Sequence, residues 1–372
     1  MFGLSVITFL VVLTVLVFVH EMGHYLVARW CGVRVDVFSI GFGRELIGWN
    51  DKSGTRWKIS MIPLGGYVKF SGDEDAASRP GAGAMANTED DGNFHTKPLW
   101  QRAAVVFAGP AVNYIFAAIL FAGMFMTYGV PSTTNRISEV VENSAAAEAG
   151  LIAGDRIVAM NDQPIERFED LRQFMALNLD RPVDATIERD GRQLVLPVRP
   201  HLDEQKDSLN NTIRRGLLGV RSERREMREV GVAEATWEGA AQTITMTAVN
   251  LEALWDIVTG HRSSDEISGP IGIARMTGQA AEISPAAVIN IMAVISVGLG
   301  MINLFPIPML DGGHLLFYAI EAIKRKPMSE RAQEFSFKIG FALVISLMVF
   351  ATVNDIQKAA AGLLDGVLGW FS

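Results

Sequence analysis

Four long apolar stretches alternate with polar segments along the 372-residue chain. They run from Gly3 to Ala28, from Ala103 to Val130, from Pro285 to Phe305 and from Ile339 to Val353. Each is long enough, or nearly so, to cross the roughly 30 Å of hydrocarbon in a bilayer, and the fourth is the shortest. The first is not typical of a signal peptide, because no basic residue precedes it and no small-residue cleavage site follows it. The pattern therefore predicts about four transmembrane helices.

The segment between the first two stretches has two parts. Apolar and polar residues alternate in Val33–Leu46 and Thr55–Phe70, and both ranges are rich in β-branched and aromatic residues. Together with the turn signal Gly65-Gly66, this pattern predicts β hairpins. Residues 72–98 are acidic and rich in Gly, Ala and Asp, which predicts a mobile loop. His95 lies in this loop and is expected to be solvated rather than a metal ligand.

A compact soluble domain is predicted from Val130 to Pro200. Strand patterns at Ile157–Met160 and Val183–Ile187 flank a helical stretch at Phe168–Leu177. Asp190-Gly191 is typical of a hairpin turn between two strands.

A polar linker is predicted after this domain, from His201 to Arg215. The stretch Ala233–Thr259 then spaces Trp237, Ile244 and Leu251 as on one face of an amphipathic helix. Such a helix can lie on the membrane surface or pack against the neighbouring domain, and the sequence does not separate these two interpretations.

The amino-acid composition limits the kinds of site and partner that the chain can have. Hydrophobic residues make up 49% of the chain and charged residues 20%, and the net charge of −8 gives no support to nucleic-acid binding. Cys31 is the only cysteine, so an intrachain disulfide and a cysteine-based zinc site are excluded. Any metal must therefore be held by carboxylates and by some of the six histidines.

Basic residues near the ends of the apolar stretches predict the orientation in the membrane. None precedes the first stretch, whereas Arg29 and Arg34 follow it and Arg102 precedes the second. The connection between the third and fourth stretches is also basic. We therefore expect both connections on the cytoplasmic side, and both termini and the segment from about Pro131 to Ser284 on the opposite side.

The motif His20-Glu21-Met22-Gly23-His24 follows a run, from Gly3 through Val19, that contains no charged residue. Two histidines four residues apart lie on one face of a helix and can bind the same zinc ion. Ionisable groups at membrane depth are costly and each needs a partner, which disfavours a purely structural role. His20 and His24 are therefore predicted to be metal ligands, and Glu21 to be a general base that acts on a water molecule.

A catalytic zinc ion needs a third protein ligand and an open position. Asp311 is the best candidate; it lies in the segment Asn303–His314, where two prolines break the helix and paired glycines follow. Because the first and third stretches run in the same direction, their C-terminal ends meet on one side of the membrane, which brings Asp311 near His24. The alternatives are a helix-capping or turn role for Asp311, and His314 as the ligand in its place.

These motifs together resemble the site-2 protease family, and most of all the bacterial regulator of sigma-E protease type. The resemblance covers nearly the whole chain and is carried, in matching order, by His20–His24, Phe38–Gly43, Gly109–Asn113 and Asn303–His314. It implies an intramembrane zinc protease in which His20, His24 and Asp311 bind the metal and Glu21 is the base.

The resemblance also implies substrate-binding residues. Asn113 and Asn303 match polar positions that help to hold the substrate, although hydrogen bonds between helices explain both asparagines equally well. Family members use a membrane-dipping β element after the first span, and Ile62–Lys69 resembles it. Its Gly65-Gly66-Tyr67 segment is therefore predicted to pair with an unwound substrate at a strand edge.

The predicted soluble domain resembles a permuted bacterial PDZ domain, best at Gly150–Ile157. PDZ grooves bind extended peptides by strand addition, so this domain is expected to bind peptides or periplasmic proteins, or to act mainly as a steric filter. The chain departs from the two-PDZ form of the family, because only one such domain is readable. How substrates are screened is left open by this departure.

The expected fold is a multi-pass α-helical membrane protein with a membrane-associated β element and an inserted PDZ-like α+β domain. The expected function is a zinc endopeptidase of the bacterial inner membrane, with its site near the cytoplasmic face. Its implied substrates are membrane-embedded single-pass proteins, such as anti-sigma factors and signal-peptide remnants, cleaved in regulated intramembrane proteolysis. The alternatives are a non-catalytic PDZ scaffold or receptor with a structural metal, which Glu21 disfavours, and a metal transporter, which the scarcity of other intramembrane carboxylates disfavours.

The expected organisation follows from these assignments. It comprises transmembrane helix 1 with the histidine motif (1–30), β hairpins and the acidic loop (31–102), transmembrane helix 2 (103–130), the PDZ-like domain (131–200), a linker and amphipathic helical segment (201–284), transmembrane helix 3 with the Asp311 motif (285–323), a cytoplasmic basic connection (324–338), and transmembrane helix 4 with a C-terminal tail (339–372).

Overall fold

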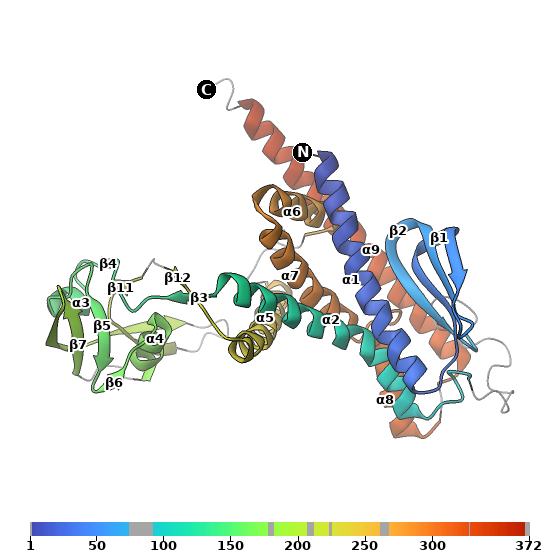
Figure 1. Ribbon diagram of the computed structural model, residues 1–372, viewed down its shortest axis with the longest axis horizontal. Coiled ribbons are helices and arrows are strands. Elements are labelled where there is room, and N and C mark those ends of the chain that lie inside the picture. Colours follow the sequence, from blue (N-terminus) through green and yellow to red (C-terminus); the bar gives the residue numbers. More distant parts are fainter. Residues whose placement is uncertain are drawn as a thin grey trace. The chain divides into compact units, whose positions relative to one another are not determined.

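The computed structural model describes residues 2–73, 92–177, 182–206, 212–222, 225–260, 268–326 and 328–368. Most of the predicted acidic loop therefore lies outside the described residues. The chain divides into two compact units (Figure 1). Unit 1 comprises Met1–Met124 and Thr236–Ser372, and unit 2 comprises Phe125–Ala235.

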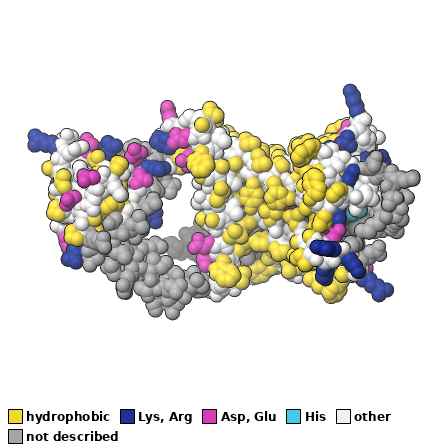
Figure 2. Space-filling model, turned by 90° about the horizontal axis from the view of Figure 1, so that it is seen from below, with side chains coloured by type: hydrophobic (Ala, Val, Ile, Leu, Met, Phe, Trp, Pro, Cys, Tyr) yellow, Lys and Arg dark blue, Asp and Glu magenta, His cyan; other side chains and the backbone are white. Residues whose placement is uncertain are grey.

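Within the described ranges, four helices are long and apolar enough to cross a membrane, as the sequence predicts. They are α1 (Phe2–Trp30), α2 (Leu99–Tyr128), α7 (Pro285–Asn303) and α9 (Glu330–Leu368). Many apolar side chains on the outer faces of these helices stay exposed, such as Phe341 of α9 at 55%. Figure 2 shows a broad hydrophobic surface over the helices of unit 1, which is the kind of surface that a bilayer covers.

The third predicted span, Pro285 to Phe305, corresponds to α7 (Pro285–Asn303). A separate helix, α8 (Asp311–Lys324), follows after the break that the sequence predicts there. The two intervening prolines lack the amide hydrogen that a continuous helix needs. Within the predicted basic connection 324–338, α9 already begins at Glu330. An ion pair of 2.8 Å between Lys338 and Glu334, one turn apart, supports this first part of α9.

Glycines let the helices around α1 approach closely. A Cβ on Gly23 of α1 would collide with the carbonyl oxygen of Ala108 in α2. α1 also packs along α6 (Pro270–Ile283), where a Cβ on Gly278 would collide with Ser5. The first of these contacts places the C-terminal half of α1 directly against α2.

The predicted β hairpin is confirmed as an antiparallel pair of long strands, β1 (Val35–Asn50) and β2 (Arg56–Phe70). Ile40 pairs with Ile59 on one side and with Gly66 on the other, so β2 bends back and flanks the first part of β1 from both sides. Residues 66–70 therefore form an edge of this small sheet. The first part of β1 is buried against α1 and α2 in one core cluster that includes Val35 and Phe38.

The predicted amphipathic helix is confirmed as α5 (Val232–Val258). Its Gly239 lies against α2, where a Cβ would collide with the carbonyl oxygen of Ala118, and its Thr243 is buried. Trp237 and Ile244 point away from this contact and are 73% and 71% exposed. α5 thus packs on the second predicted span and keeps an exposed apolar stripe.

Unit 2 contains the predicted soluble domain. Its four-stranded antiparallel sheet has the order β6-β5-β7-β8, and helix α4 (Phe168–Leu177) packs with it around a core that includes Ile157, Leu171 and Ile187. The strands are β5 (Arg156–Met160), β6 (Gln163–Pro164), β7 (Val183–Arg189) and β8 (Arg192–Val198), and a short helix, α3 (Ala145–Glu148), precedes them. The predicted strands, helix and Asp190-Gly191 turn are therefore confirmed.

The C-terminal boundary of this domain was predicted too early. The segment expected to be a polar linker contains β9 (His201–Lys206) and β10 (Thr212–Leu217), which pair with each other. Unit 2 is closed by pairing of its first and last strands: β4 (Glu139–Val140) with β11 (Val220–Arg221), and β3 (Val130–Thr133) with β12 (Arg225–Arg228). These late strands are short or polar, and their partners lie some 80 or more residues away in the chain, so local hydrophobic alternation gives no signal for them.

A partly buried ion pair stabilises the sheet of unit 2. Arg189 donates from Nε and Nη2 to the two carboxylate oxygens of Asp155, both at 2.7 Å. Burial raises the pKa of the Asp155 carboxyl, but the hydrogen bonds from Arg189 and from the Ile152 N–H lower it by more, so this pKa lies below its usual range.

Candidate metal centre

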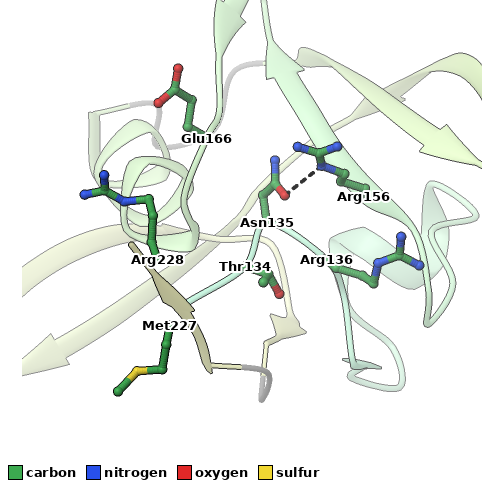
Figure 3. Close-up of a pocket in the computed structure, with 7 residues that line it drawn as sticks. All are labelled: Thr134, Asn135, Arg136, Arg156, Glu166, Met227 and Arg228. Atoms are coloured by element: carbon green, nitrogen blue, oxygen red, sulfur yellow. Dashed lines mark hydrogen bonds between the residues drawn. The ribbon is translucent and has the colours of Figure 1, made fainter. Parts of the chain in front are cut away.

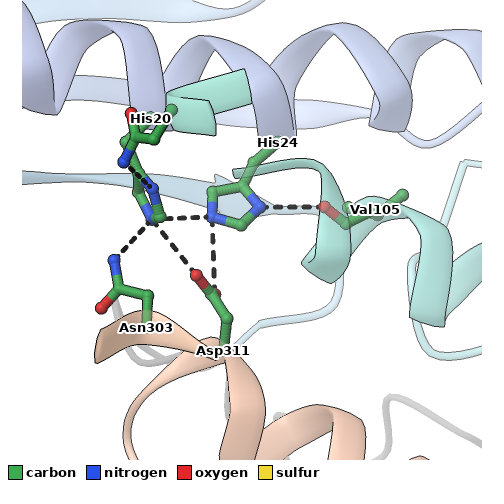
Figure 4. A network of polar contacts seen from close by, with 6 residues as sticks. His20, His24, Val105, Asn303 and Asp311 are labelled. Carbon is green, nitrogen blue, oxygen red and sulfur yellow. Dashed lines mark hydrogen bonds and ion pairs between the residues drawn. The ribbon is translucent and has the colours of Figure 1, made fainter. Parts of the chain in front are cut away.

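His20 and His24 project from one face of α1, one turn apart, and both are buried. Their Nε2 atoms lie 3.3 Å from each other. The other ring nitrogen of His24, Nδ1, lies 2.9 Å from the carbonyl oxygen of Val105 in α2 (Figure 4). Since a carbonyl can only accept, Nδ1 carries the hydrogen and Nε2 keeps its lone pair.

Asp311 begins α8 and reaches the two histidines across the break that follows α7 (Figure 4). Its carboxylate oxygens lie 3.2 Å from Nε2 of His20 and 3.5 Å from Nε2 of His24. The turn before Asp311 is tight because Gly312 and Gly313 lie against the carbonyl groups of Leu304 and Ile307, where a Cβ would collide. Asp311 is expected from the sequence to lie near His24, and the structure brings these side chains together.

These donors fit a zinc ion. Their ligand atoms all lie within 4.8 Å of one another. Two ligands that are each about 2.0–2.1 Å from a tetrahedral zinc ion lie about 3.3 Å apart, and the separations of 3.2, 3.3 and 3.5 Å agree with this value. Two imidazoles and one carboxylate are also a donor set that catalytic zinc sites use, with the fourth position left open.

Glu21 lies beside these ligands but is not one of them. It is buried, and its carboxylate accepts a hydrogen bond from the N–H of Val68 in β2. Its side chain faces a cavity of about 530 Å³ that His20, His24 and Asp311 also line. A carboxylate in this place can accept a proton from a water molecule in the cavity.

The Gly65-Gly66-Tyr67 segment of β2 lines the same cavity. A Cβ on Gly66 would collide with Val17 of α1 and come within 3.2 Å of Cγ of Glu21. Glycine at this position therefore allows the edge of the β1–β2 sheet to lie directly against the histidine motif.

The two asparagines named from the sequence lie in different surroundings. Asn303, at the end of α7, lines the cavity, and its Nδ2 is 3.4 Å from Nε2 of His20. Asn113, in α2, is fully buried, with its Nδ2 3.1 Å from Nδ1 of His20. Both asparagines therefore contact His20, but from opposite sides of its ring.

His314 and His95 are not part of the ligand group. His314 lines the cavity, and its ring lies 5.4 Å from the ring of Phe337 in α9. The expectation that His95 is solvated is wrong: its side chain is 7% exposed, and Nε2 lies 2.8 Å from Oδ1 of the buried Asp73. This contact joins residues 22 positions apart in the chain, and the acidic composition of the segment between them gives no sign of it.

Sequence reasoning missed the backbone groups that hold the site. The carbonyl of Val105 fixes His24, and the N–H of Val68 fixes Glu21. Any residue type supplies these groups, so no side-chain pattern in the sequence reveals them.

A second cavity, of about 410 Å³, lies in unit 2 (Figure 3). Its arginines diverge rather than converge: Arg228 pairs with Glu234 at 2.6 Å, and Arg136 donates to the carbonyl of Gly154 at 3.2 Å. Arg156 donates to Asn135 at 3.1 Å. These three arginines bind groups within unit 2 and do not converge on a common anion site.

Apolar helices that bring two histidines, a neighbouring glutamate and an aspartate together in one cavity define a membrane-embedded metalloprotease. A model described as Peptidase family M50 matches residues 8–347 of the chain. The chain therefore belongs to peptidase family M50, the site-2 protease family, which confirms the resemblance.

Relatives of similar length support this assignment. A protein named as a zinc metalloprotease in Agrobacterium fabrum is 45% identical over 360 residues, which is 95% of this chain and 96% of the relative. A protein with the same description in Rhizobium meliloti is 44% identical over 357 residues, 94% of this chain and 96% of the relative. Metalloprotease MmpA of Caulobacter vibrioides is 38% identical over 383 residues, 96% of each chain.

Among solved structures, the PDZ domain of the SdrC-like protein from Listeria monocytogenes matches 25% of this chain and 90% of its own length. The identity is 13% and the TM-score is 0.20. So weak a similarity carries no argument, and the PDZ assignment of unit 2 stays a prediction.

Proposed function

We propose that the chain is an intramembrane zinc endopeptidase in which His20, His24 and Asp311 hold the metal and Glu21 is the general base. One observation carries the assignment. Three metal-binding side chains from two elements far apart in the sequence meet within 4.8 Å, beside a cavity that Glu21 also faces.

The metal ligands and Glu21 have different roles in the proposed peptide hydrolysis. A zinc ion held by His20, His24 and Asp311 would polarise the scissile carbonyl and acidify the attacking water molecule. Glu21 takes the proton from that water and passes it to the leaving nitrogen. The hydrogen bond from Val68 keeps the Glu21 carboxylate oriented toward the cavity during both transfers.

Asn303 is the better placed asparagine to contact the substrate. It lines the cavity, and its amide lies beside the proposed ligand atom of His20. An NH₂ group at this position can donate to a substrate carbonyl, where negative charge develops in the transition state. This arrangement supports the substrate-binding role that the family resemblance implies for Asn303.

The Gly65-Gly66-Tyr67 segment is proposed to pair with the substrate backbone. The N–H groups of Val68 and Phe70 point away from β1, since they donate to Glu21 and to Oδ2 of Asp73. Alternate residues of a strand share an edge, so Gly66 presents its backbone on the same side. A substrate helix must unwind before it is cut, because its amides are bonded internally, and strand pairing replaces some of those bonds.

The substrates are proposed to be single-pass membrane proteins, of which anti-sigma-factor-like proteins and signal-peptide remnants are the classes implied by the family. The proposed location is the inner membrane of a bacterium, with the metal centre near the cytoplasmic side. Unit 2 is proposed to be a periplasmic PDZ-like domain that binds peptides or screens substrates by size. The exposed apolar stripe of α5 suits contact with the lipid bilayer.

Glu21→Gln tests the proposal. The variant is expected to bind zinc as the wild type does but to lose cleavage of a co-expressed single-pass reporter, because an amide cannot accept the proton. Glu282→Gln, an exposed carboxylate at the end of α6, is the matched control and should cleave normally. Full cleavage by Glu21→Gln would sink the mechanism and leave the scaffold alternative in place.

A further inference from the structure

The two proposed histidine ligands are fixed at their second ring nitrogen by different groups. Nδ1 of His24 donates to the carbonyl of Val105, which can only accept. Nδ1 of His20 instead faces the side-chain amide of Asn113 at 3.1 Å. An amide can donate through its NH₂ group or accept through its oxygen, so the group that faces Nδ1 decides which nitrogen of His20 carries the hydrogen.

Asn113 is buried and lies away from the cavity. Its side chain is fully buried, and its backbone oxygen accepts a hydrogen bond of 2.8 Å from the hydroxyl of Ser296 in α7, which is also fully buried. Asn303 is among the residues that line the cavity, whereas Asn113 is not. A substrate in the cavity therefore contacts Asn303 but does not reach Asn113.

We infer that Asn113 is a positioning residue: its side-chain oxygen accepts the Nδ1 hydrogen of His20 and thereby keeps the lone pair of His20 on Nε2, where the metal binds. This inference rests on the proposed zinc site. It separates the roles of the two asparagines, which the sequence alone left together.

The opposite orientation of the amide is incompatible with metal binding. If Nδ2 donated to Nδ1, a neutral His20 would carry its hydrogen on Nε2, the atom that lies 3.2 Å from Asp311 and 3.3 Å from His24. Turning the oxygen of Asn113 toward Nδ1 gives that oxygen, otherwise buried with no hydrogen-bond partner in the part of the chain that the structure describes, a donor and frees Nε2. The same turn moves the NH₂ group to the place that the oxygen held, so the choice of orientation rests on the tautomer of His20 that a metal requires.

The test is the zinc affinity of the purified full-length protein in detergent, measured by competition with a chromogenic chelator. Asn113→Leu removes the acceptor at similar volume and is expected to weaken zinc binding about 10- to 100-fold, the usual effect of losing such a partner. Asn113→Asp restores an acceptor and is expected to stay within about threefold of the wild type. Asn290→Leu, at an exposed asparagine of α7, is the matched control and should leave the zinc affinity unchanged.

The outcomes separate this inference from the proposed function. A wild type that binds zinc and cleaves its reporter, together with an Asn113→Leu variant of unchanged affinity, overturns the positioning role alone. Equal loss of zinc in Asn113→Leu and Asn113→Asp overturns it too, since packing would then explain the effect. A wild type that binds no zinc overturns the metal centre itself.

Discussion

Gly109 of α2 lies directly against the imidazole of His24 on α1, so that a Cβ at this position would collide with Nε2 and Cε1 of the ring. Nε2 is the proposed ligand atom. The ring cannot withdraw freely, because Nδ1 is bonded to the carbonyl of Val105 at 2.9 Å. The absence of a side chain at residue 109 is therefore a condition for the metal centre to form.

Gly109→Ala is expected to weaken zinc binding by roughly tenfold or more, since forcing an extra methyl group into a packed site costs about 1–3 kcal/mol. Reporter cleavage should fall with it. The measurement is the zinc affinity of the purified variant. Gly123→Ala in the same helix is the matched control, because nothing lies within 4 Å of a Cβ there. Equal zinc affinities for both variants would contradict the packing argument.

The proposed ligands and base could be predicted from the sequence because their chemistry belongs to their side chains. His20, Glu21 and His24 form a pattern with a fixed helical spacing, and Asp311 follows a break that two prolines make visible. The topology of the spans then brought Asp311, the third proposed ligand, to the His20–His24 motif. A resemblance was needed to name Asn113 and Asn303, because an asparagine in an apolar helix has several physical explanations.

The rest was hidden because it depends on pairing between distant segments. The strands β11 and β12 find their partners, β4 and β3, some 80 or more residues earlier in the chain. The segment interpreted as a linker holds the local pair β9 and β10, whose mostly polar residues lack the apolar alternation of a buried strand. Backbone partners such as the Val105 carbonyl carry no signal in the sequence at all. The same applies to His95, whose partner Asp73 is close only in the folded chain.

Removing the Asp311 carboxylate is expected to remove a metal ligand and, with it, the activity. Asp311→Asn should lower the zinc content of the purified protein and abolish cleavage, because a neutral amide is a much poorer zinc ligand than a carboxylate. A chelator should inactivate the wild type, and added zinc should restore it. Zinc content by elemental analysis is the measurement. A variant with full zinc content would move the third ligand elsewhere, with His314 in the same cavity as the first candidate.

The ion pair between Asp155 and Arg189 predicts an acid-sensitive unit 2. The folded pKa of Asp155 lies below its unfolded value of about 3.9, so the folded state binds fewer protons and the carboxylate contributes stability above that value. This contribution is expected to fall as the pH drops from about 5 through the folded pKa. Hydrogen exchange of unit 2 in the full-length protein, corrected for the intrinsic rate at each pH, measures it.

Asp155→Asn supplies the control for this pH dependence. It keeps the shape of the side chain but removes the titrating group, so it should destabilise unit 2 by about 2 kcal/mol near neutral pH and flatten the acid dependence. If the variant and the wild type lose protection in parallel as the pH falls, another group is responsible.

Asp355 of α9 is expected to stabilise unit 1 by capping α6. Its carboxylate is 5% exposed and accepts hydrogen bonds from the N–H groups of Gly269, at 3.1 Å, and Gly272, at 2.7 Å, at the N-terminus of that helix. A negative charge there also complements the helix dipole. Asp355→Ala leaves both N–H groups without their acceptor and should lower the free energy of unfolding by about 2–3 kcal/mol.

The thermal midpoint of the full-length protein in detergent should therefore fall in Asp355→Ala. Asp355→Asn keeps one acceptor oxygen, so its midpoint should lie between those of Asp355→Ala and the wild type. Zinc affinity measured below the transition should be the same in all three proteins, because Asp355 is not among the residues that line the metal-site cavity. A midpoint for Asp355→Ala equal to that of the wild type would show that α6 is held without this contact.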